Sequence, residues 1–253
     1  RFQPIEILKP FLIIMVSTIF TLNNQRHLYF KYLFSFLIIF PVILFLISQP
    51  DLGQTILVVL TWFSLIFVSG INLLFFFGFF ALTFSILLYL ILYISKFEYI
   101  KNRLISFIEP NSGNNYQSER ASEAISNGGF FGQGIGEGTL NSKVPEAHTD
   151  YIISVISEEF GVIIVLLIMI IFLTLSYNIL KKIKYENDDK VKLILVGIAS
   201  IILFQTFIHI GVNIRLLPTT GMTLPFLSYG GSSIISTSIL SGIILNLTKR
   251  KIS

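Results

Sequence analysis

Seven apolar stretches dominate this chain, and each is long enough for a helix that crosses a lipid bilayer, which takes about 20 mostly apolar residues. Charged residues make up only 13% of the 253 residues, far below the roughly 25% of soluble domains. A soluble globule could not hide so much apolar surface. The sequence therefore predicts an all-α fold, a polytopic transmembrane helix bundle. The expected spans cover residues 5–21, 32–48, 53–69, 72–95, 152–180, 193–212 and 225–247.

Basic residues in the short connections indicate the orientation, because loops rich in Lys and Arg stay in the cytoplasm. They follow the first and fifth expected spans and close the chain, three places that share one side if the spans alternate. Residue 1 then starts outside, and the polar segment 96–150 forms a large extracytoplasmic loop within a single membrane domain, residues 1–253. The basic residues are Arg26, Lys31, Lys181, Lys182, Lys184, Lys190, Lys192, Lys249, Arg250 and Lys251.

Several classes of protein and site are excluded or disfavoured by composition. The absence of cysteine excludes disulfides, thiolate metal sites and a cysteine nucleophile. The topology accounts for the positive charge, so nucleic-acid binding has no support, and an odd number of spans disfavours a complete inverted-repeat transporter. Arg1 is not an initiator methionine and no signal peptide follows it, so we expect that the true N-terminus is missing.

Polar residues gather in four places, all on the outer side of this topology. They are the start of the first span, the turn 49–55, the segment 143–159 and the segment 213–233. Intramembrane polar groups are costly and usually face a bundle interior or a wet cavity. Their convergence is typical of a site at the outer leaflet.

The third place contains the acids Glu146 and Asp150 with His148 between them. If a helix begins just before Asp150, then Asp150, Ser154 and Glu158 share one face over roughly 12 Å. A carboxylate there can act as a general base; a capping or ion-pairing role is the alternative. His-x-Asp alone is a weak metal pattern. A divalent cation, Mg²⁺ or Mn²⁺, that bridges Asp150 to a pyrophosphate suits the residues better.

The sixth expected span carries Gln205, His209 and Asn213 at intervals of four, which places them on one face. Such a stripe either forms hydrogen bonds between helices or lines a substrate cavity. Glu6 and Lys9 are three residues apart, the spacing of an intrahelical ion pair, and binding of an anionic group is the alternative role.

The remaining polar motifs carry weaker signals. The glycine-dense segment 127–138 lacks the Gly-Lys-Ser/Thr ending of a P-loop, and a flexible surface or re-entrant loop is expected. Ser228, Ser232 and Ser233 have no nearby Lys or His in sequence, so no nucleophilic serine is indicated. Arg215 is the basic residue of the fourth place and could contact a phosphate.

Five of these motifs together resemble the SEDS family of peptidoglycan polymerases, in order along nearly the whole chain. They lie at residues 2–6, 49–55, 145–152, 158–161 and 217–233. The sequence Pro-Glu-Ala-His-Thr-Asp ending at Asp150 is more similar to division-type members (FtsW) than to elongation-type members (RodA). Ile5 stands where the family usually has Ser, and Tyr151 where Phe is common.

The resemblance implies a ten-span fold of which this chain supplies the last seven spans. It implies a peptidoglycan glycosyltransferase that polymerises lipid II into glycan strands during cell division. Asp150 is then the catalytic carboxylate and the candidate ligand of a divalent cation, and no organic cofactor is expected. The predicted substrate-binding residues are Arg1, Gln3, Glu6, Lys9, Glu146, His148, Glu158, Gln205, His209, Asn213, Arg215 and Ser232.

The same resemblance implies the surroundings of the protein. Its substrates would be lipid II and a polyprenyl-pyrophosphate-linked glycan strand. Its protein partners would be a class B penicillin-binding transpeptidase and other division proteins, in the bacterial cytoplasmic (inner) membrane at the septum. A flippase for the lipid-linked precursor, a non-enzymatic division scaffold and an elongation-type paralogue are the alternatives.

Overall fold

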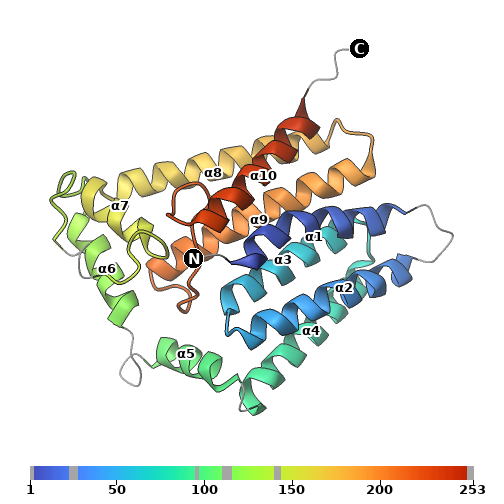
Figure 1. Cartoon of the computed structure of the whole chain (residues 1–253), viewed down its shortest axis with the longest axis horizontal. Coiled ribbons are helices and arrows are strands. Elements are labelled where there is room, and N and C mark those ends of the chain that lie inside the picture. Colours follow the sequence, from blue (N-terminus) through green and yellow to red (C-terminus); the bar gives the residue numbers. More distant parts are fainter. Residues whose placement is uncertain (1–2, 23–27, 95–96, 110–115, 140–143, 250–253) are drawn as a thin grey trace.

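The chain forms a bundle of helices in the computed structural model, which describes residues 3–22, 28–94, 97–109, 116–139 and 144–249 (Figure 1). No β-strand occurs within these ranges. The helices are α1 (Pro4–Thr21), α2 (Leu28–Ser48), α3 (Leu52–Val68), α4 (Leu73–Tyr93), α5 (Glu98–Ile108), α6 (Tyr116–Gly128), α7 (Ile152–Phe160), α8 (Val162–Ile183), α9 (Asp189–Asn213) and α10 (Gly231–Thr248).

All seven predicted spans contain an apolar helix. Helices α1, α2, α4, α8, α9 and α10 are long and apolar enough to cross a membrane, and α3 is a shorter apolar helix of 17 residues. Helix α9 is the most enclosed of the six, with 78% of its apolar window buried, whereas α4 has none buried. The predicted all-α membrane bundle is confirmed, with α9 at its centre and α4 at its edge.

Two predicted boundaries are wrong. The expected span 152–180 is two helices, because Gly161 has a φ of +84° and separates α7 from α8. The last helix begins at Gly231 instead of residue 225, because residues 225–230 belong to the preceding loop. The polar segment 96–150 holds the helices α5 and α6, and its place as a loop within one domain stays a prediction.

In the glycine-dense segment 127–138, the first two residues end α6 and the turn that follows is hydrogen bonded to α7; the flexibility expected of it stays a prediction. The backbone N–H groups of Gln133 and Gly134 donate to the carbonyls of Glu158 and Glu159, at 2.9 and 3.0 Å. A Cβ atom on Gly161 would lie 2.1 Å from the carbonyl oxygen of Phe130. Glycine is therefore needed where the turn meets the junction of α7 and α8.

Gly161→Ala is expected to destabilise the protein more than Gly136→Ala. Both glycines have a positive φ, but a Cβ at Gly136 meets nothing within 4 Å. The control therefore carries only the strain of an alanine in the left-handed conformation, about 1–2 kcal/mol, while Gly161→Ala adds a clash with backbone. Thermal unfolding in detergent measures both, and equal melting temperatures would contradict the close packing of Gly161 on Phe130.

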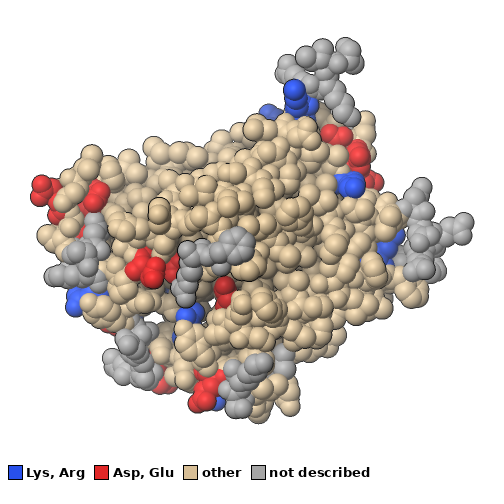
Figure 2. All heavy atoms as spheres, in the orientation of Figure 1, with Lys and Arg blue, Asp and Glu red and all other residues tan. Residues whose placement is uncertain are grey.

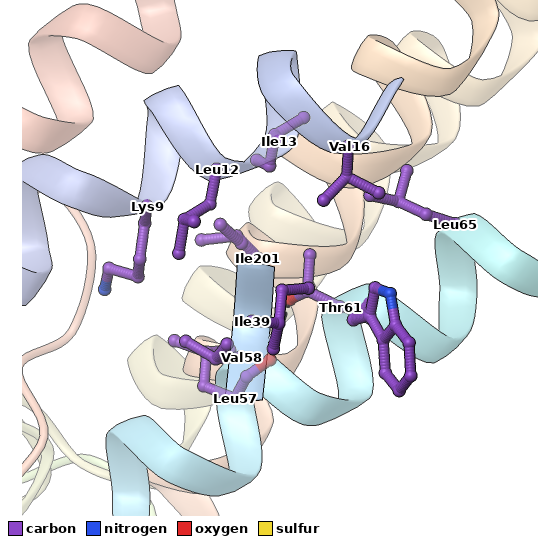
Figure 3. Close-up of a pocket in the computed structure, with 11 residues that line it drawn as sticks. Lys9, Leu12, Ile13, Val16, Ile39, Leu57, Val58, Thr61, Leu65 and Ile201 are labelled. Carbon is purple, nitrogen blue, oxygen red and sulfur yellow. Dashed lines mark hydrogen bonds between the residues drawn. The ribbon is translucent and has the colours of Figure 1, made fainter. Parts of the chain in front are cut away.

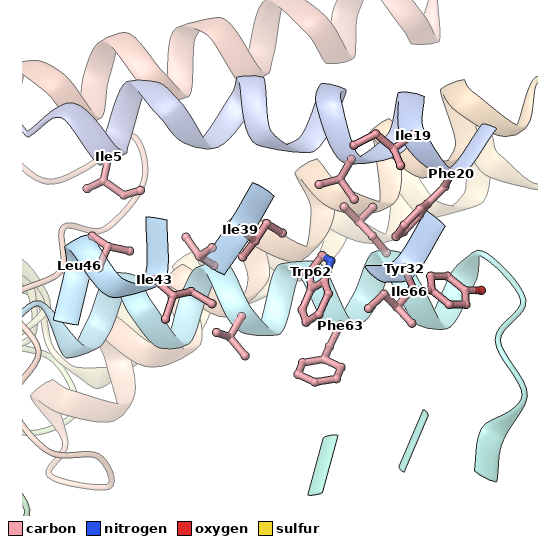
Figure 4. Packing of buried hydrophobic residues seen from close by; sticks show 14 of the residues in the cluster. Ile5, Ile19, Phe20, Tyr32, Ile39, Ile43, Leu46, Trp62, Phe63 and Ile66 are labelled. Carbon is pink, nitrogen blue, oxygen red and sulfur yellow. The ribbon is translucent and has the colours of Figure 1, made fainter. Parts of the chain in front are cut away.

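The first half of the bundle is held by a core between α1, α2 and α3 (Figure 4). Trp62 lies in it with its ring tilted against those of Phe63 and Phe36, at 5.3 and 5.8 Å between ring centres, and its indole N–H donates to the Ser35 hydroxyl at 3.1 Å. Burial of aromatic rings with their polar atoms paired is strongly stabilising. This core fixes the position of α1, whose first turns carry Glu6 and Lys9.

On the face that Figure 2 shows, charged side chains lie toward two ends of the molecule, with a belt of uncharged side chains between them. One end carries the α8–α9 connection and the C-terminal end of α10. The other carries α5, α6, α7 and the start of α1 (Figure 1). A bundle that spans a membrane presents such an uncharged belt to lipid. The four polar places of the sequence converge at the end that carries α5, α6 and α7.

Candidate functional site

The turn before α7 carries Asp150 and winds around one backbone carbonyl. The oxygen of Glu146 accepts N–H groups from Thr149, Asp150 and Tyr151, at 3.0, 3.0 and 3.3 Å. Glu146 has a φ of +55°, a left-handed conformation that closes the turn. The predicted helix start near Thr149 is wrong, since α7 begins at Ile152. Asp150 thus stands outside the helix.

The backbone of this turn is clamped from the other side by three successive carbonyls, those of residues 148–150. They accept the N–H of Tyr229 at 2.9 Å, the hydroxyl of Ser228 at 2.6 Å and the amide Nδ2 of Asn213 at 3.2 Å, in that order. The three donors come from α9 and from the loop before α10. Two distant parts of the chain therefore fix the position of Asp150, which is the preorganisation that catalytic groups require.

The half-buried carboxylate of Asp150 lies over Gly221. A Cβ atom on Gly221 would stand 3.3 Å from its Oδ2, and Gly221 has a φ of +64°. Burial raises the pKa of the neighbouring Tyr151 to about 12, the negative charge of Asp150 adds to this, and Arg103 acts against it. The Tyr151 phenol therefore stays neutral beside the carboxylate at physiological pH.

Arg103 is a site residue that sequence reasoning missed. Its Nη1 donates to the carbonyl of Thr219 at 3.1 Å, and its guanidinium lies 4.4 Å from the ring centre of Tyr99. It joins α5 to the loop that crosses Asp150. Together with Arg215 it lines a cavity of about 20 Å³. Arginine suits anionic oxygens because its planar fork presents several N–H donors. The signal available in sequence was weak, since Arg103 lies in a polar segment without a motif.

Arg215, the predicted phosphate ligand, lies at the rim of the same cavity. It has a φ of +58°, and its Nη2 lies 3.9 Å from Oε1 of Glu119, so the pair is a loose surface contact. Such pairs contribute little to stability. The guanidinium also lines a wide surface depression with Glu119, Ser122 and Asn127. Its role toward a phosphate stays a prediction.

The polar stripe of α9 binds the loop before α10 and also forms the hydrogen bonds between helices that its spacing suggested, to Lys9 of α1 and Ser154 of α7. Gln205 Nε2 donates to the carbonyl of Thr223 at 2.8 Å, and His209 Nδ1 lies 2.7 Å from the carbonyl of Met222. Because a carbonyl can only accept, His209 carries its proton on Nδ1. Both side chains are buried, and so is Asn213. The stripe holds the loop before α10 under Asp150; a contact with substrate remains a prediction for all three.

Asn213→Ala is expected to lower the free energy of unfolding by about 1–3 kcal/mol, the cost of leaving a buried polar group unpaired. The side chain donates to the carbonyls of His209 and Asp150 and accepts from the N–H of Ser154 at 3.2 Å. Thermal unfolding measures the effect, with the exposed Asn178→Ala as the matched control. An unchanged melting temperature for Asn213→Ala would contradict the clamp.

Glu6 and Lys9 form the intrahelical ion pair that their spacing predicts, with Oε2 and Nζ 2.7 Å apart. Their side chains are almost wholly buried, 1% and 2% exposed. Lys9 also donates to Oε1 of Gln205 at 3.2 Å, and Gln54 Nε2 donates to Glu6 at 2.5 Å. Lys9 stands at the edge of an apolar cavity of about 20 Å³, which has room for roughly one water molecule (Figure 3).

The other predicted residues are spread around the turn. The backbone N–H of Gln3 donates to the Ser232 hydroxyl at 3.3 Å, which ties α1 to α10. Glu158 is buried under α6, where Nδ2 of Asn127 donates to it at 3.1 Å. Glu146 and His148 are exposed on the turn itself. Arg1 lies outside the described residues, and within them no group of three or more His, Asp or Glu gathers as a metal site would require.

Comparison with known proteins identifies the family. The FTSW_RODA_SPOVE family, described as "Cell cycle protein", matches residues 1–252. The chain belongs to the FtsW/RodA/SpoVE family. The chain is similar to curated proteins named "Probable peptidoglycan glycosyltransferase FtsW". The protein of Caulobacter vibrioides is 33% identical over 251 residues, and the protein of Pasteurella multocida is 34% identical over 260 residues. Each match covers 98% of this chain but only 63% and 64% of the relative.

Solved structures of FtsW/RodA/SpoVE proteins share the fold. A chain from work described as "Structural coordination of polymerization and crosslinking by a peptidoglycan synthase complex" has a TM-score of 0.74 and 28% identity, and the match covers 98% of this chain and 69% of that one. The RodA D255A mutant of Thermus thermophilus has a TM-score of 0.64 and 26% identity, with 98% and 65% covered. The chain therefore spans about two thirds of its relatives.

Proposed function

We propose that the protein containing this chain is a peptidoglycan glycosyltransferase that polymerises lipid II during cell division. The observation that carries the proposal is the carboxylate of Asp150, held on a clamped turn at one end of a membrane bundle and over the loop that Arg103 contacts at Thr219. The names of its relatives agree with it. Basic residues at the opposite end favour an extracytoplasmic site, where lipid-linked sugars are joined.

In this mechanism Asp150 accepts the proton of the attacking sugar hydroxyl of lipid II. The hydroxyl oxygen forms a bond to the anomeric carbon of the donor strand, and the bond from that carbon to the pyrophosphate oxygen breaks. The polyprenyl pyrophosphate leaves with the bonding electron pair. A positioned general base of this kind contributes about 10²–10⁴-fold to the rate.

Arg103 and Arg215 are the groups that would stabilise the leaving pyrophosphate. They line one cavity, and Arg103 is anchored to the loop beneath Asp150. Charge-assisted hydrogen bonds from arginine to phosphate oxygens strengthen as negative charge develops. We therefore assign base chemistry to Asp150 and electrostatic stabilisation to the arginines.

An apolar groove between α2 and α4 suits the polyprenyl tails. It has a volume of about 400 Å³ and extends along α2 from Tyr29 to Ile47, most of the length of the helix. Its lining is aromatic and aliphatic, with Phe36, Phe75 and Phe79 among the lining side chains. A long hydrocarbon chain lying there would keep the sugar headgroup at the membrane surface.

The remaining elements of the proposal are a cation, a partner and a location. Asp150 alone does not make a cation site, so Mg²⁺ or Mn²⁺ would take most of its oxygen ligands from pyrophosphate and water. No step of the proposed mechanism depends on this cation.

We propose a class B penicillin-binding transpeptidase as the protein partner, because a similar chain comes from a peptidoglycan synthase complex. We place both proteins in the cytoplasmic membrane at the septum.

The test is a polymerisation assay with the full-length protein, its transpeptidase and purified lipid II, read out as glycan strands on a gel. Strands that require the full-length protein support the proposal. Absence of strands, together with translocation of labelled lipid II across vesicle membranes, would replace the enzyme with the flippase alternative.

A further inference from the structure

The turn of the glycine-dense segment presents three large apolar side chains away from the protein. Phe130, Phe131 and Ile135 are 73%, 84% and 79% exposed, higher fractions than most lipid-facing side chains of α2 and α4. The proposed chemistry at Asp150 uses none of them. Apolar side chains that project from a fixed turn indicate a surface that is covered in the functional state.

The turn is attached directly to the first residues of the spanning helix α8. The N–H of Val162 donates to the carbonyl of Gly129 at 3.0 Å, and the N–H of Ile163 donates to that of Phe130 at 3.5 Å. Phe130 therefore lies at the same level along the bundle as the first turn of α8.

The level of that first turn relative to the membrane follows from the length of α8. Its other end carries Lys181 and Lys182 in the last turn, which mark the edge of the hydrocarbon region. The apolar residues from Gly161 to Leu180 then span roughly 30 Å at 1.5 Å per residue, one hydrocarbon thickness. The start of α8, and with it the turn, falls at the boundary between hydrocarbon and headgroups.

The lateral position of the turn agrees with this depth. Ile163, Leu166, Leu167 and Ile170 are exposed on one face of α8, at the spacing of a lipid-facing stripe. Phe130 is hydrogen bonded to the first of these residues through its backbone. The phenylalanines thus extend an apolar surface that already faces lipid, at the level where aromatic rings concentrate in membrane proteins.

We propose that Phe130, Phe131 and Ile135 insert into the headgroup boundary of the bilayer and anchor the turn there. The polar Gln133 between them fits such a position, since its Nε2 donates to the backbone carbonyl of Asn127 at 3.3 Å. Interfacial segments combine buried apolar side chains with paired polar groups in this way.

The anchor sets the depth of the helices that carry the site. Gly128 packs so closely on α7 that a Cβ would lie 2.0 Å from the carbonyl of Ser157, and α7 follows directly on Asp150. These contacts join the backbone of the turn to the backbone of α7, and the turn follows directly on α6. Insertion of the phenylalanines therefore holds the carboxylate at the height of the lipid headgroups.

The test places an environment-sensitive NBD label at Phe131→Cys in the full-length protein, reconstituted in phosphatidylcholine and phosphatidylglycerol vesicles. The chain contains no cysteine of its own. Leu166→Cys on the lipid-facing stripe and the exposed Tyr185→Cys after α8 are the matched controls. Nitroxide lipids labelled near the carbonyl and iodide on both sides of the vesicle membrane serve as quenchers.

If the turn inserts into lipid, the nitroxide lipids quench the label at position 131 as strongly as the label at position 166. Iodide then quenches the label at 131 at least twofold less than the label at 185. Quenching like that at 185 would overturn the proposal. Protection that arises only after the transpeptidase is added would also overturn it, because the surface would then belong to a protein partner. Neither result bears on polymerisation by Asp150, so this inference and the proposed function fail separately.

Discussion

Asp150→Asn is expected to lower the rate of lipid II polymerisation by roughly 10²–10⁴-fold, the contribution of a positioned general base. The amide keeps the size of the carboxylate but cannot accept the hydroxyl proton. The clamp on the turn uses backbone carbonyls of residues 148–150, so the substitution leaves it in place. Glycan strands made by the full-length variant with its transpeptidase measure the effect.

The matched control is Glu137→Gln, the same kind of change at an exposed acid in the same polar segment. It should polymerise at the wild-type rate, and both variants should keep the melting temperature of the wild type. A folded Asp150→Asn variant that makes strands at the wild-type rate would refute the base mechanism. An unfolded one would instead show that the carboxylate, which lies over Gly221, supports the fold.

The membrane helices could be predicted from the sequence because lipid demands long apolar stretches, and this requirement is local. The break at Gly161 was missed for the opposite reason. A glycine inside an apolar run is compatible with a continuous helix, and only the turn at Gly129 and Phe130, which accepts the N–H groups of the new helix, explains why the chain bends there. Such tertiary partners are not visible in a local pattern.

The site shows the same division between local and long-range information. Asp150 was found because it ends a recognisable motif, and the stripe on α9 because its spacing is periodic. The stripe binds a loop that returns under Asp150. This contact depends on packing between segments far apart in sequence, which a local pattern does not show. Arg103 was missed because its importance comes only from its contact with Thr219, over a hundred residues away.

Lys9→Met is expected to cost about 3–5 kcal/mol of stability, the usual effect of removing one partner of a buried ion pair. Glu6 would keep its hydrogen bond from Gln54 but lose the ammonium 2.7 Å away, and Gln205 would lose a donor. Both charges are almost wholly buried, so bulk water does not solvate the carboxylate left without its partner. Thermal unfolding of the full-length protein in detergent measures the loss.

The double variant Glu6→Gln/Lys9→Met separates a structural pair from a substrate-binding one. It removes both charges while glutamine can still bond to Gln54, so it should recover most of the stability lost in Lys9→Met. If the pair is structural, polymerisation recovers with the fold. If the double variant is as stable as the wild type but inactive, Glu6 and Lys9 contact substrate. A single Lys9→Met variant with unchanged stability would mean that the buried pair does not hold α1 in the bundle.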